Sequence, residues 1–273
     1  MDDVLGYAGK QVIVTGAASG MGQATAQVLV ALGAAVTAID LNPSTVEGAT
    51  ALQVDLRDPS AIADAVATIS GPVNAFFNCA GLPGPPFSDL DVMLVNFVGG
   101  RELIESVVPQ MPSGSAIAYV SSAAGIGWQG NLATLTELLE TPDFAAGKAW
   151  CEAHPEHIGA SAYMFSKQTI DAWVAWRSVP LQRDHGIRLN CTAPGPTATA
   201  MMPFFQEANG KAIIDAAQGP VGRYSTPEEQ AWPLVFLNSP RASYVTGETF
   251  YTDGGFFGAL QTGQVDFSAL MPS

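Results

Sequence analysis

The sequence predicts an α/β fold in which a doubly wound parallel sheet carries helices on both faces. Short, nearly all-apolar runs alternate with longer segments of helical periodicity, as strands covered on both faces require. This alternation continues from residue 11 to about residue 253, and no repeat, charge run or Ser/Pro-rich linker interrupts it. Glycine and polar residues follow several apolar runs directly, where such sheets form a ligand crevice. A single domain spanning residues 1–273 is therefore expected.

The expected elements follow one another along the whole chain. Strands are predicted at residues 11–15, 35–39, 51–54, 73–78, 116–121, 187–192 and 249–252. Helices are predicted at residues 21–32, 60–69, 91–108, 162–183 and 227–237. Pro59 and Pro227 stand at the starts of two of these helices, where the first turn needs no amide hydrogen. Right-handed crossovers between successive strands bring their carboxyl ends to one edge of the sheet.

Charge and hydropathy exclude several classes of partner. The chain has 25 acidic and 11 basic residues, a net charge of −14, whereas nucleic acids and anionic lipids require clustered Lys and Arg. The first residues lack the basic and apolar regions of a secretion signal, and no uninterrupted apolar stretch reaches about 18 residues. We therefore expect a soluble, cytoplasmic protein that binds neither nucleic acid nor membrane.

The cysteines and one cluster of metal-ligand residue types predict neither a disulfide nor a metal site. The three cysteines are widely spaced, and two lie in strand-like runs, so we expect buried thiols at Cys79, Cys151 and Cys191. The cluster consists of Cys151, Glu152, His154, Glu156 and His157. Pro155 breaks the helix that would put those side chains on one face, so this segment is expected to be a solvated loop.

The first apolar run ends in a glycine-rich turn that opens the first helix. The turn reads Thr15-Gly16-Ala17-Ala18-Ser19-Gly20-Met21-Gly22. A pyrophosphate needs a tight turn, backbone without Cβ atoms and the free amides of a helix N-terminus, and three glycines at this spacing meet these needs. The turn is a candidate dinucleotide site, although similar glycine clusters occur in ordinary turns.

Asp40 ends the second predicted strand, 18 positions after Gly22. A carboxylate there can accept hydrogen bonds from the adenosine ribose hydroxyls and repels a 2′-phosphate. No Lys or Arg occurs at residues 15–24 or 38–46, so the sequence favours NAD over NADP. The alternative is an Asp that only turns the chain at a strand end.

Tyr163 and Lys167 stand four residues apart in a predicted helix and therefore share one face. When hydride passes between an alcohol carbon and a nicotinamide ring, a base must take the hydroxyl proton. A free phenol, with a pKa of about 10, is too weak a base at neutral pH. A fixed ammonium and the positive nicotinamide would move the pKa of Tyr163 toward the working range. The alternative is an ordinary Tyr/Lys surface contact one turn apart.

Six motifs occur in a fixed order along the chain. They are the glycine-rich turn, Asn78-Cys79-Ala80-Gly81, Asn96, Ser121-Ser122, Tyr163-x-x-x-Lys167 and Pro194-Gly195. This ordered set resembles the short-chain dehydrogenase/reductase family from about residue 9 to residue 255. The short 81–96 segment and the long 122–163 segment are most similar to the bacterial NAD-dependent 3α-hydroxysteroid dehydrogenase/carbonyl reductase branch. The resemblance implies a Rossmann fold and oxidoreduction between an alcohol and a ketone.

The resemblance also implies further contacts to NAD. Asp55 and Leu56 match a pair that contacts adenine, and Asn78, Ala80 and Gly81 match an element that lines the adenosine side with a mostly structural role. Thr197 and Thr199 match contacts to the pyrophosphate and carboxamide, with a hydroxyl-capped loop as the alternative. The complete expected site consists of Gly16, Ser19, Gly20, Met21, Gly22, Asp40, Leu41, Asp55, Leu56, Asn78, Ala80, Gly81, Tyr163, Lys167, Pro194, Gly195, Thr197 and Thr199.

The catalytic residues implied by the resemblance are Asn96, Ser122, Tyr163 and Lys167. Ser122 hydrogen-bonds the reacting oxygen, and strand alternation places its competitor Ser121 on the opposite face. Lys167 also binds the nicotinamide ribose. Asn96 interrupts its long helix and holds a water that relays protons from Lys167. Without the resemblance, an Asn satisfied by the i−4 carbonyl is the alternative.

One segment departs from the family pattern, because Tyr163 follows Ser122 by 41 positions. The 127–160 insert is expected to form one or two helices that cover the cleft or the surface where related chains pair their long helices. Its apolar face consists of Leu132, Leu135, Leu138 and Leu139. We therefore expect a homo-oligomer, with a dimer through residues 227–237 and the last strand favoured over a tetramer.

The expected substrate is a secondary alcohol on an apolar, cyclic skeleton such as a hydroxysteroid. Its pocket would be lined by Trp128, Met201, Met202, Phe204 and Phe205, although such residues also form ordinary cores. One alternative is a dehydrogenase of an aromatic, terpenoid or dihydrodiol alcohol. Another is a non-catalytic NAD-sensing protein on the same fold, against which the intact Tyr163 and Lys167 pair argues.

Overall fold

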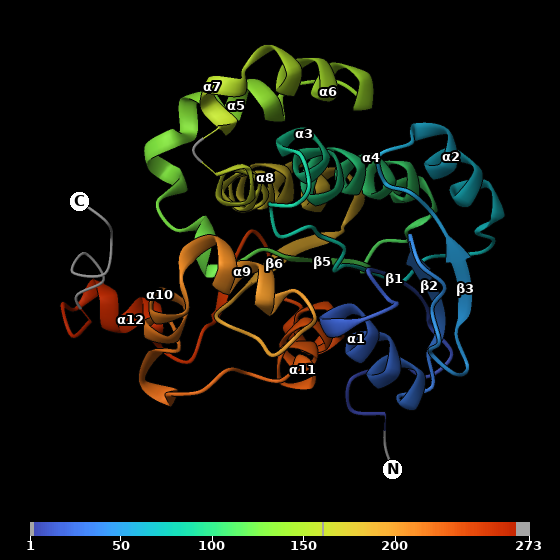
Figure 1. Ribbon diagram of the computed structural model, residues 1–273. Coiled ribbons are helices and arrows are strands. Elements are labelled where there is room, and N and C mark those ends of the chain that lie inside the picture. The colour runs from blue at the N-terminus through green and yellow to red at the C-terminus, as the bar shows by residue number, and fades with distance from the viewer. Residues whose placement is uncertain (1–2, 160, 266–273) are drawn as a thin grey trace.

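One seven-stranded parallel sheet organises the protein, as a computed structural model of residues 3–159 and 161–265 shows (Figure 1). The strands are β1 (Gln11–Thr15), β2 (Ala35–Asp40), β3 (Thr50–Gln53), β4 (Ala75–Asn78), β5 (Ala116–Val120), β6 (Arg188–Pro194) and β7 (Thr249–Thr252). Their order in the sheet is β3-β2-β1-β4-β5-β6-β7. The chain reverses its direction of travel across the sheet between β1 and β4, where a ligand crevice forms in such folds. The predicted doubly wound parallel sheet is confirmed.

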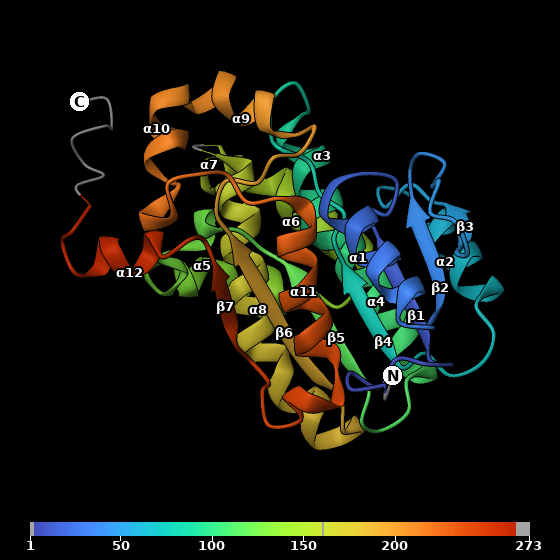
Figure 2. The ribbon, with the colours of Figure 1, turned by 90° about the horizontal axis from the view of Figure 1, so that it is seen from below.

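Helices cover both faces of this sheet. One face is covered by α1 (Gly20–Ala31) and α11 (Pro227–Asn238), and the other by α2 (Pro59–Thr68), α3 (Asp89–Met93), α4 (Gly99–Val107) and α8 (Ala162–His185) (Figure 1). Figure 2 shows α9 (Met202–Asn209) and α10 (Lys211–Ala216) beyond the carboxyl ends of the strands. Helix α12 (Phe256–Gln261) follows the last strand.

Alternation along the strands divides the core into two clusters. In β1, Val12 and Val14 pack in the cluster that contains the buried residues of α1 and α11, whereas Ile13 packs in the larger cluster under α4 and α8. Successive side chains of a strand point to opposite faces, so a strand covered on both sides must be apolar throughout. This is why the strands were recognisable as short apolar runs.

Capping residues and prolines mark the first residues of α2 and α11, close to the predicted starts. Helix α2 begins at Pro59, and the carboxylate of Asp58 accepts a hydrogen bond from the amide of Ser60 at 2.8 Å. Helix α11 begins at Pro227 after a capping box between Thr226 and Glu229. Both prolines occupy the first helical position, where a missing amide hydrogen leaves no acceptor unsatisfied, as predicted.

The helix predicted at residues 91–108 is interrupted. Helix α3 runs into a π-helical turn, Leu94–Val98, which then continues as α4. A π-helical turn widens the helix and shifts its hydrogen bonds, and such turns occur often at functional sites. Asn96 lies in this turn, so the expectation that it interrupts regular helical bonding is confirmed.

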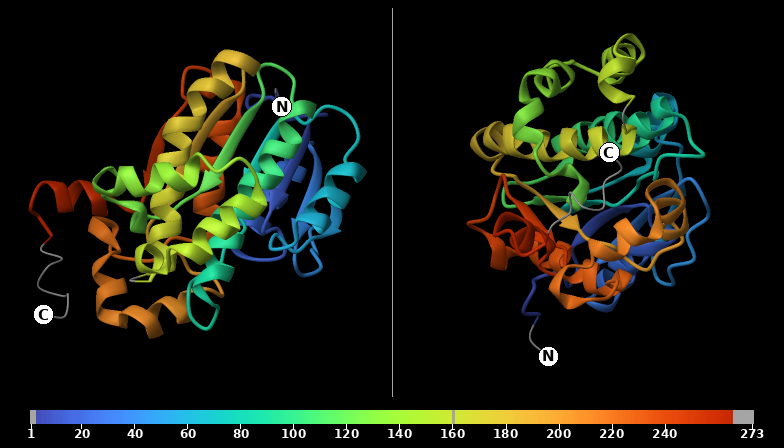
Figure 3. Two further views of the ribbon diagram at one scale, coloured as in Figure 1. Left: turned by 90° about the horizontal axis from the view of Figure 1, so that it is seen from above. Right: turned by 60° about the vertical axis from the view of Figure 1, so that its left-hand side comes forward.

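Residues 127–159 of the insert form a third layer outside the helices of the sheet (Figure 3). Its helices are α5 (Leu132–Leu139), α6 (Phe144–Ala153) and the short α7 (Pro155–Ile158), one more than the one or two expected. The side-chain amide of Asn131 donates to Gln168 on α8 at 2.7 Å, and the rings of Trp150 and Phe165 stack with centroids 6.1 Å apart. The insert therefore packs on part of α8, while Ala160 lies outside the described residues.

Two expectations for the insert are wrong. The segment 151–157 is not a solvated loop but the end of α6 and the start of α7, because the rings of His154 and His157 stack on Trp150. Pro155 does separate the two helices, as the first residue of α7. Leu132 does not belong to the buried face of α5, since its side chain is 46% exposed.

The cysteines all lie in the described residues and are free thiols, with Cys151 and Cys191 buried and Cys79 partly buried. Within residues 3–159 and 161–265, no group of three or more His, Cys, Asp or Glu side chains is arranged to hold a metal ion. Over the same residues, every helix is too short or too polar to cross a lipid bilayer.

Candidate active site

The glycine-rich turn after β1 has a backbone that only glycine can adopt. Gly16 and Gly20 have φ values of +67° and +56°, in the left-handed region. A Cβ atom on Gly16 would lie 2.8 Å from the backbone of Cys79, and one on Gly22 would lie 2.2 Å from the Gly16 carbonyl oxygen. The turn leads directly into α1, and the first amides of this helix have no acceptors within it. This cradle fits a pyrophosphate group.

Thr15 holds the carboxyl ends of β1 and β4 together. Its hydroxyl donates to the side-chain oxygen of Asn78 at 2.5 Å and accepts hydrogen bonds from the amides of Cys79 and Ala80, each at 3.1 Å. Asn78 is fully buried, which agrees with the mostly structural role expected for it. Thr15 is not among the predicted site residues, although its place at the end of a strand was a usable signal.

Asp40 lies at the end of β2, beside the glycine-rich turn. Its two carboxylate oxygens accept hydrogen bonds from the amides of Ala18 at 3.0 Å and Asn42 at 2.8 Å. The residue is partly exposed, and no ion pair involves it in the described part of the chain. The neighbouring Leu41 side chain is 49% exposed. A carboxylate held in this way can still accept hydrogen bonds from a ligand.

Asp55 has a partner that the resemblance did not predict. Its carboxylate forms an ion pair with Arg57 at 2.7 Å, and Arg57 also contacts Asp91 at 3.1 Å. The Arg57 side chain holds the pKa of Asp55 below its usual range. Leu56 is buried, and its carbonyl oxygen lies so close to α4 that only glycine fits at Gly99. Both residues stay predictions as adenine contacts.

Ser122, Tyr163 and Lys167 come together where β5 ends beside α8. The Ser122 hydroxyl is hydrogen-bonded to the Tyr163 hydroxyl, and Nζ of Lys167 lies 5.5 Å from the centre of the Tyr163 ring. Nζ of Lys167 donates to the carbonyl oxygen of Val120 at 2.9 Å. Ser121 faces away and donates to the Lys167 carbonyl oxygen at 3.3 Å. Strand alternation therefore leaves Ser122, not Ser121, beside the phenol.

Burial shifts the pKa of both titratable side chains in this cluster. It raises the pKa of Tyr163 to about 12, with the hydrogen bond from Ser122 opposing it. It also lowers the pKa of Lys167 to about 8, with Asp171 opposing it. Both shifts belong to the protein alone, because loss of water disfavours the charged form of each group. The expectation that Lys167 and the positive nicotinamide together lower the pKa of Tyr163 stays a prediction.

The side-chain amide and the main-chain carbonyl of Asn96 are all hydrogen-bonded within the protein. Its side-chain oxygen accepts from the amide of Leu82 at 2.6 Å, and its side-chain nitrogen donates to the Leu82 carbonyl at 3.1 Å and to Ser166 at 3.0 Å. Its main-chain carbonyl accepts from the hydroxyl of Tyr119 at 2.7 Å. The alternative of an i−4 bond is therefore wrong, and Asn96 fastens the chain after Gly81 to α8.

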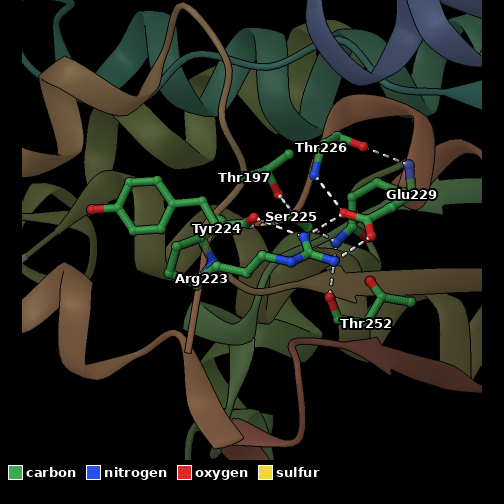
Figure 4. Close-up of polar contacts among 9 residues, drawn as sticks. Thr197, Arg223, Tyr224, Ser225, Thr226, Glu229 and Thr252 are labelled. Carbon is green, nitrogen blue, oxygen red and sulfur yellow. Dashed lines mark hydrogen bonds and ion pairs between the residues drawn. The ribbon is translucent and has the colours of Figure 1, made fainter. Parts of the chain in front are cut away.

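The turn after β6 approaches the glycine cradle through one of its two threonines. A Cβ atom on Gly20 would lie 3.4 Å from the methyl carbon of Thr199. Thr197 faces the other way, as its hydroxyl is hydrogen-bonded to Ser225 at 2.9 Å (Figure 4). The same hydroxyl donates to the Gly195 carbonyl oxygen at 3.0 Å. For Thr197, the structure has the hydroxyl-capped loop that was considered as the alternative. Pro194 ends β6, and Gly195 packs too closely against Asp253 to carry a side chain.

An aromatic residue of α9 lies over the phenol. The ring centres of Phe205 and Tyr163 are 4.9 Å apart, with an interplanar angle of 59°. Met202 is buried, Phe204 is 38% exposed, and Trp128 packs against the core under α8. Among the predicted pocket residues, Phe205 thus contacts Tyr163 directly.

Comparison with known proteins identifies the family. Residues 10–133 match the family model described as short chain dehydrogenase, and residues 153–257 match one described as enoyl-(acyl carrier protein) reductase. The chain is 32% identical to a 3-alpha-hydroxysteroid dehydrogenase/carbonyl reductase of Comamonas testosteroni, covering 93% of this chain and 98% of that protein. The protein belongs to the short-chain dehydrogenase/reductase family. This dehydrogenase/reductase is therefore an oxidoreductase acting on alcohols.

Two further similarities place this dehydrogenase/reductase more closely. It is 29% identical to a coniferyl-alcohol dehydrogenase of a Pseudomonas species, over 90% of this chain and 96% of that protein. Its fold matches the crystal structure of a 3-alpha-hydroxysteroid dehydrogenase from another Pseudomonas species complexed with NADH, with a TM-score of 0.79 and 26% identity. That match covers 94% of this chain and the whole of the other.

Proposed function

We propose that this protein is an NAD-dependent enzyme that interconverts a secondary alcohol and a ketone on an apolar, cyclic skeleton such as that of a hydroxysteroid. The observation that carries the proposal is the meeting of Ser122, Tyr163 and Lys167 at the carboxyl end of β5. These are the donor, the acid/base and the cation that carbonyl reduction requires. The glycine cradle of β1 opens onto the same edge of the sheet.

The proposed cofactor is NAD, which supplies the hydride acceptor or donor when it is bound. Gly16, Ser19, Gly20, Met21 and Gly22 would hold its pyrophosphate, because the cradle excludes Cβ atoms and lies at a helix N-terminus. Two observations support NAD over NADP. Asp40 has no cationic partner in the described chain, and Arg57, the basic residue after β3, is already bound by Asp55 and Asp91.

The protein's own residues handle the proton and the reacting oxygen. The Tyr163 hydroxyl takes the proton of the alcohol in oxidation and returns it in reduction, while Ser122 hydrogen-bonds the same oxygen. Burial disfavours the phenolate strongly, so nearby positive charge is essential for oxidation. Lys167 provides that charge only as an ammonium. Because its pKa is lowered to about 8, a large part of Lys167 is uncharged at that pH.

The apolar surface near Tyr163 supports the proposed substrate class. Phe205 contacts the phenol ring directly, and Met201 and Phe204 are partly exposed beside it in the sequence. A second candidate is an aromatic alcohol, which the similarity to a coniferyl-alcohol dehydrogenase favours. A planar aromatic substrate can stack against Phe205, whereas a saturated ring system only fills volume.

The test is a panel of secondary alcohols and ketones, followed at the absorbance band of reduced nicotinamide. We expect turnover of cyclic apolar alcohols with NAD and none by Tyr163→Phe. A preference for cinnamyl-type alcohols supports the second candidate. A protein that binds NAD, measured by calorimetry, but converts no member of the panel is an NAD sensor, and the proposed activity is then wrong.

We also propose a dimer built through α11 and β7. The insert packs on the first turns of α8, so pairing through that part of the helix is obstructed. On the other side, Trp232 and Phe236 of α11 and Phe250 of β7 are each more than 40% exposed. Solution mass by light scattering, for the protein and for a version with residues 127–160 replaced by a short turn, tests this. A tetramer of the intact protein through α4 and α8 contradicts it.

A further inference from the structure

Asp171, a buried acid, follows Tyr163 and Lys167 along the same face of α8. Tyr163, Lys167 and Asp171 are spaced by four residues each and so lie one above another on a single helix face. This face packs against the end of β5, where Ser122 meets Tyr163 and Ser121 meets Asp171. Neither the fold nor the proposed reaction requires an acid at this position.

Asp171 is almost completely enclosed and incompletely satisfied. Its exposed fraction is 1%, and one carboxylate oxygen, Oδ2, has no hydrogen-bond partner in the described residues. The other oxygen accepts a weak bond from the thiol of Cys191 at 3.4 Å. Gly125 lies so close that a Cβ atom there would be 2.2 Å from Oδ2. A buried carboxylate with so few partners is costly and needs a reason.

Lys167 is the cation that acts electrostatically on Asp171, from one helical turn away and without a direct ion pair in the described residues. The groups that act electrostatically on Lys167 in the described residues are Asp171 on the same helix, Cys191 on β6 and Cys79 after β4. Burial raises the pKa of both thiols, so Asp171 is the one anion among the three at neutral pH. Asp171 itself is faced by Lys167, Cys191, Ser121 and, on β7, the phenol of Tyr251.

We propose that Asp171 is a positioning residue whose buried carboxylate keeps Lys167 protonated beside Tyr163. The carboxylate acts through Lys167 and touches neither the substrate nor the reacting oxygen. For the reaction, this inference rests on the proposed function, since only a dehydrogenase needs an ammonium at this place. The pairing of the two charges can be tested on the protein without any turnover.

The pairing predicts a characteristic pH dependence. Burial raises the pKa of Asp171 to about 6, so its charge is present above that pH and absent below it. Lys167 therefore has its counter-charge in the range where its own pKa of about 8 matters. Removal of the carboxylate should leave Lys167 unchanged below pH 6 and deprotonate it earlier above pH 7.

The decisive experiment is a titration of the lysine side chains by NMR. The chain has only four lysines, of which Lys10, Lys148 and Lys211 are not buried, so ¹³C at the ε position gives four resolvable signals. Lys167→Arg assigns the fourth. We expect the Lys167 midpoint in Asp171→Asn to fall by at least about one pH unit, while the other three midpoints stay. Asp184→Asn, which removes an exposed acid from the same helix, is the matched control and should shift nothing at Lys167.

An unchanged Lys167 midpoint in a folded Asp171→Asn protein overturns the proposal. Asp171→Ser provides a second, smaller replacement with the same expected shift. Should neither variant fold, the unmodified protein decides, because an ionising neighbour must add an acidic inflection near pH 6 to the Lys167 signal. A single inflection there also overturns the proposal.

The role in the reaction has its own readout. The ratio of kcat/KM between the unmodified protein and Asp171→Asn should be near one at about pH 5.5, rise to about fivefold at pH 8 and approach tenfold at about pH 9. A loss that is equal at all pH values indicates a purely structural residue. If no alcohol is turned over at all, the proposed function fails, whereas the NMR titration still tests the charge pair.

Discussion

Arg101 on α4 should be the main anchor of the insert. Its guanidinium is 5% exposed and donates to the carbonyl oxygens of Leu138 and Thr141, each at 3.2 Å, and of Asp143 at 3.0 Å. It also donates to the Thr141 hydroxyl at 2.9 Å and lies 5.4 Å from the centre of the Phe97 ring. The carbonyl groups at the end of α5 thus receive their hydrogen bonds from α4.

Arg101→Met keeps most of the apolar stem and removes all four hydrogen bonds. Each bond to a charged donor contributes roughly 1.5 to 3 kcal/mol. The carbonyls of Leu138 and Asp143 keep amide donors from Thr141 and Gly147, whereas no other donor to the Thr141 carbonyl is present in the described residues. Part of this loss is offset, because burial of the guanidinium is itself unfavourable and lowers the pKa of Arg101. We expect a net loss of about 3 kcal/mol in the free energy of unfolding.

Urea unfolding measures the loss, and trypsin locates it. Lys148 lies on α6 with an exposed side chain, so cleavage after it should become faster when the insert detaches from α4. Arg183→Met is the matched control, since Arg183 is exposed and pairs only with its neighbour Asp184. A change in Arg101→Met no larger than in this control, in both measurements, refutes the anchoring role.

Three further outcomes are expected. Tyr163→Phe keeps the ring contact with Phe205, so stability and NAD affinity should persist while turnover falls by on the order of 10² to 10⁴. Retention of most activity in this variant contradicts the acid/base role. Lys167→Ala should reduce both the affinity for NAD and the turnover rate. Asp40→Ala should narrow the difference between NAD and NADP affinities measured by calorimetry, and equal affinities in the unmodified protein refute that assignment. Asp171 has a folded pKa of about 6 against 3.8 ordinarily, so the folded state holds the proton more tightly, and its contribution to stability is lost as pH rises from about 4 to 6; urea midpoints of the unmodified protein and Asp171→Asn that run parallel across this window would falsify it.

Several features of the site could be predicted because they depend on short-range pattern. The strands were visible as apolar runs, and the motif residues follow from where those runs end. The interruption at Asn96 was implied by the family resemblance and is present as a π-helical turn. For the strands, the information lies in the short apolar runs themselves.

Other features depended on contacts between distant segments. The hydroxyl of Thr197 bonds to Ser225, which lies 28 residues away, so the sequence around it could not show that it turns from the cradle. Residues 151–157 form the end of α6 and the start of α7, with Pro155 at the first position of α7. The rings of His154 and His157 stack on Trp150, which itself stacks on Phe165 of α8, and the local sequence does not show that last contact. Asp171 belongs to no predicted motif, and its burial becomes visible only in the structure.

By itself, the sequence determined the class of fold and the glycine cradle, because these depend on periodicity and on spacing along the chain. Its ordered motifs, through their resemblance to a family, also pointed to Ser122, Tyr163 and Lys167. Only the tertiary structure decided their protonation. The pKa of Tyr163 rises and that of Lys167 falls because both side chains are buried away from water. The segments that bury them, β5, β6, α8 and α9, are far apart in the sequence. Burial belongs to the whole packed chain, so no local pattern encodes it.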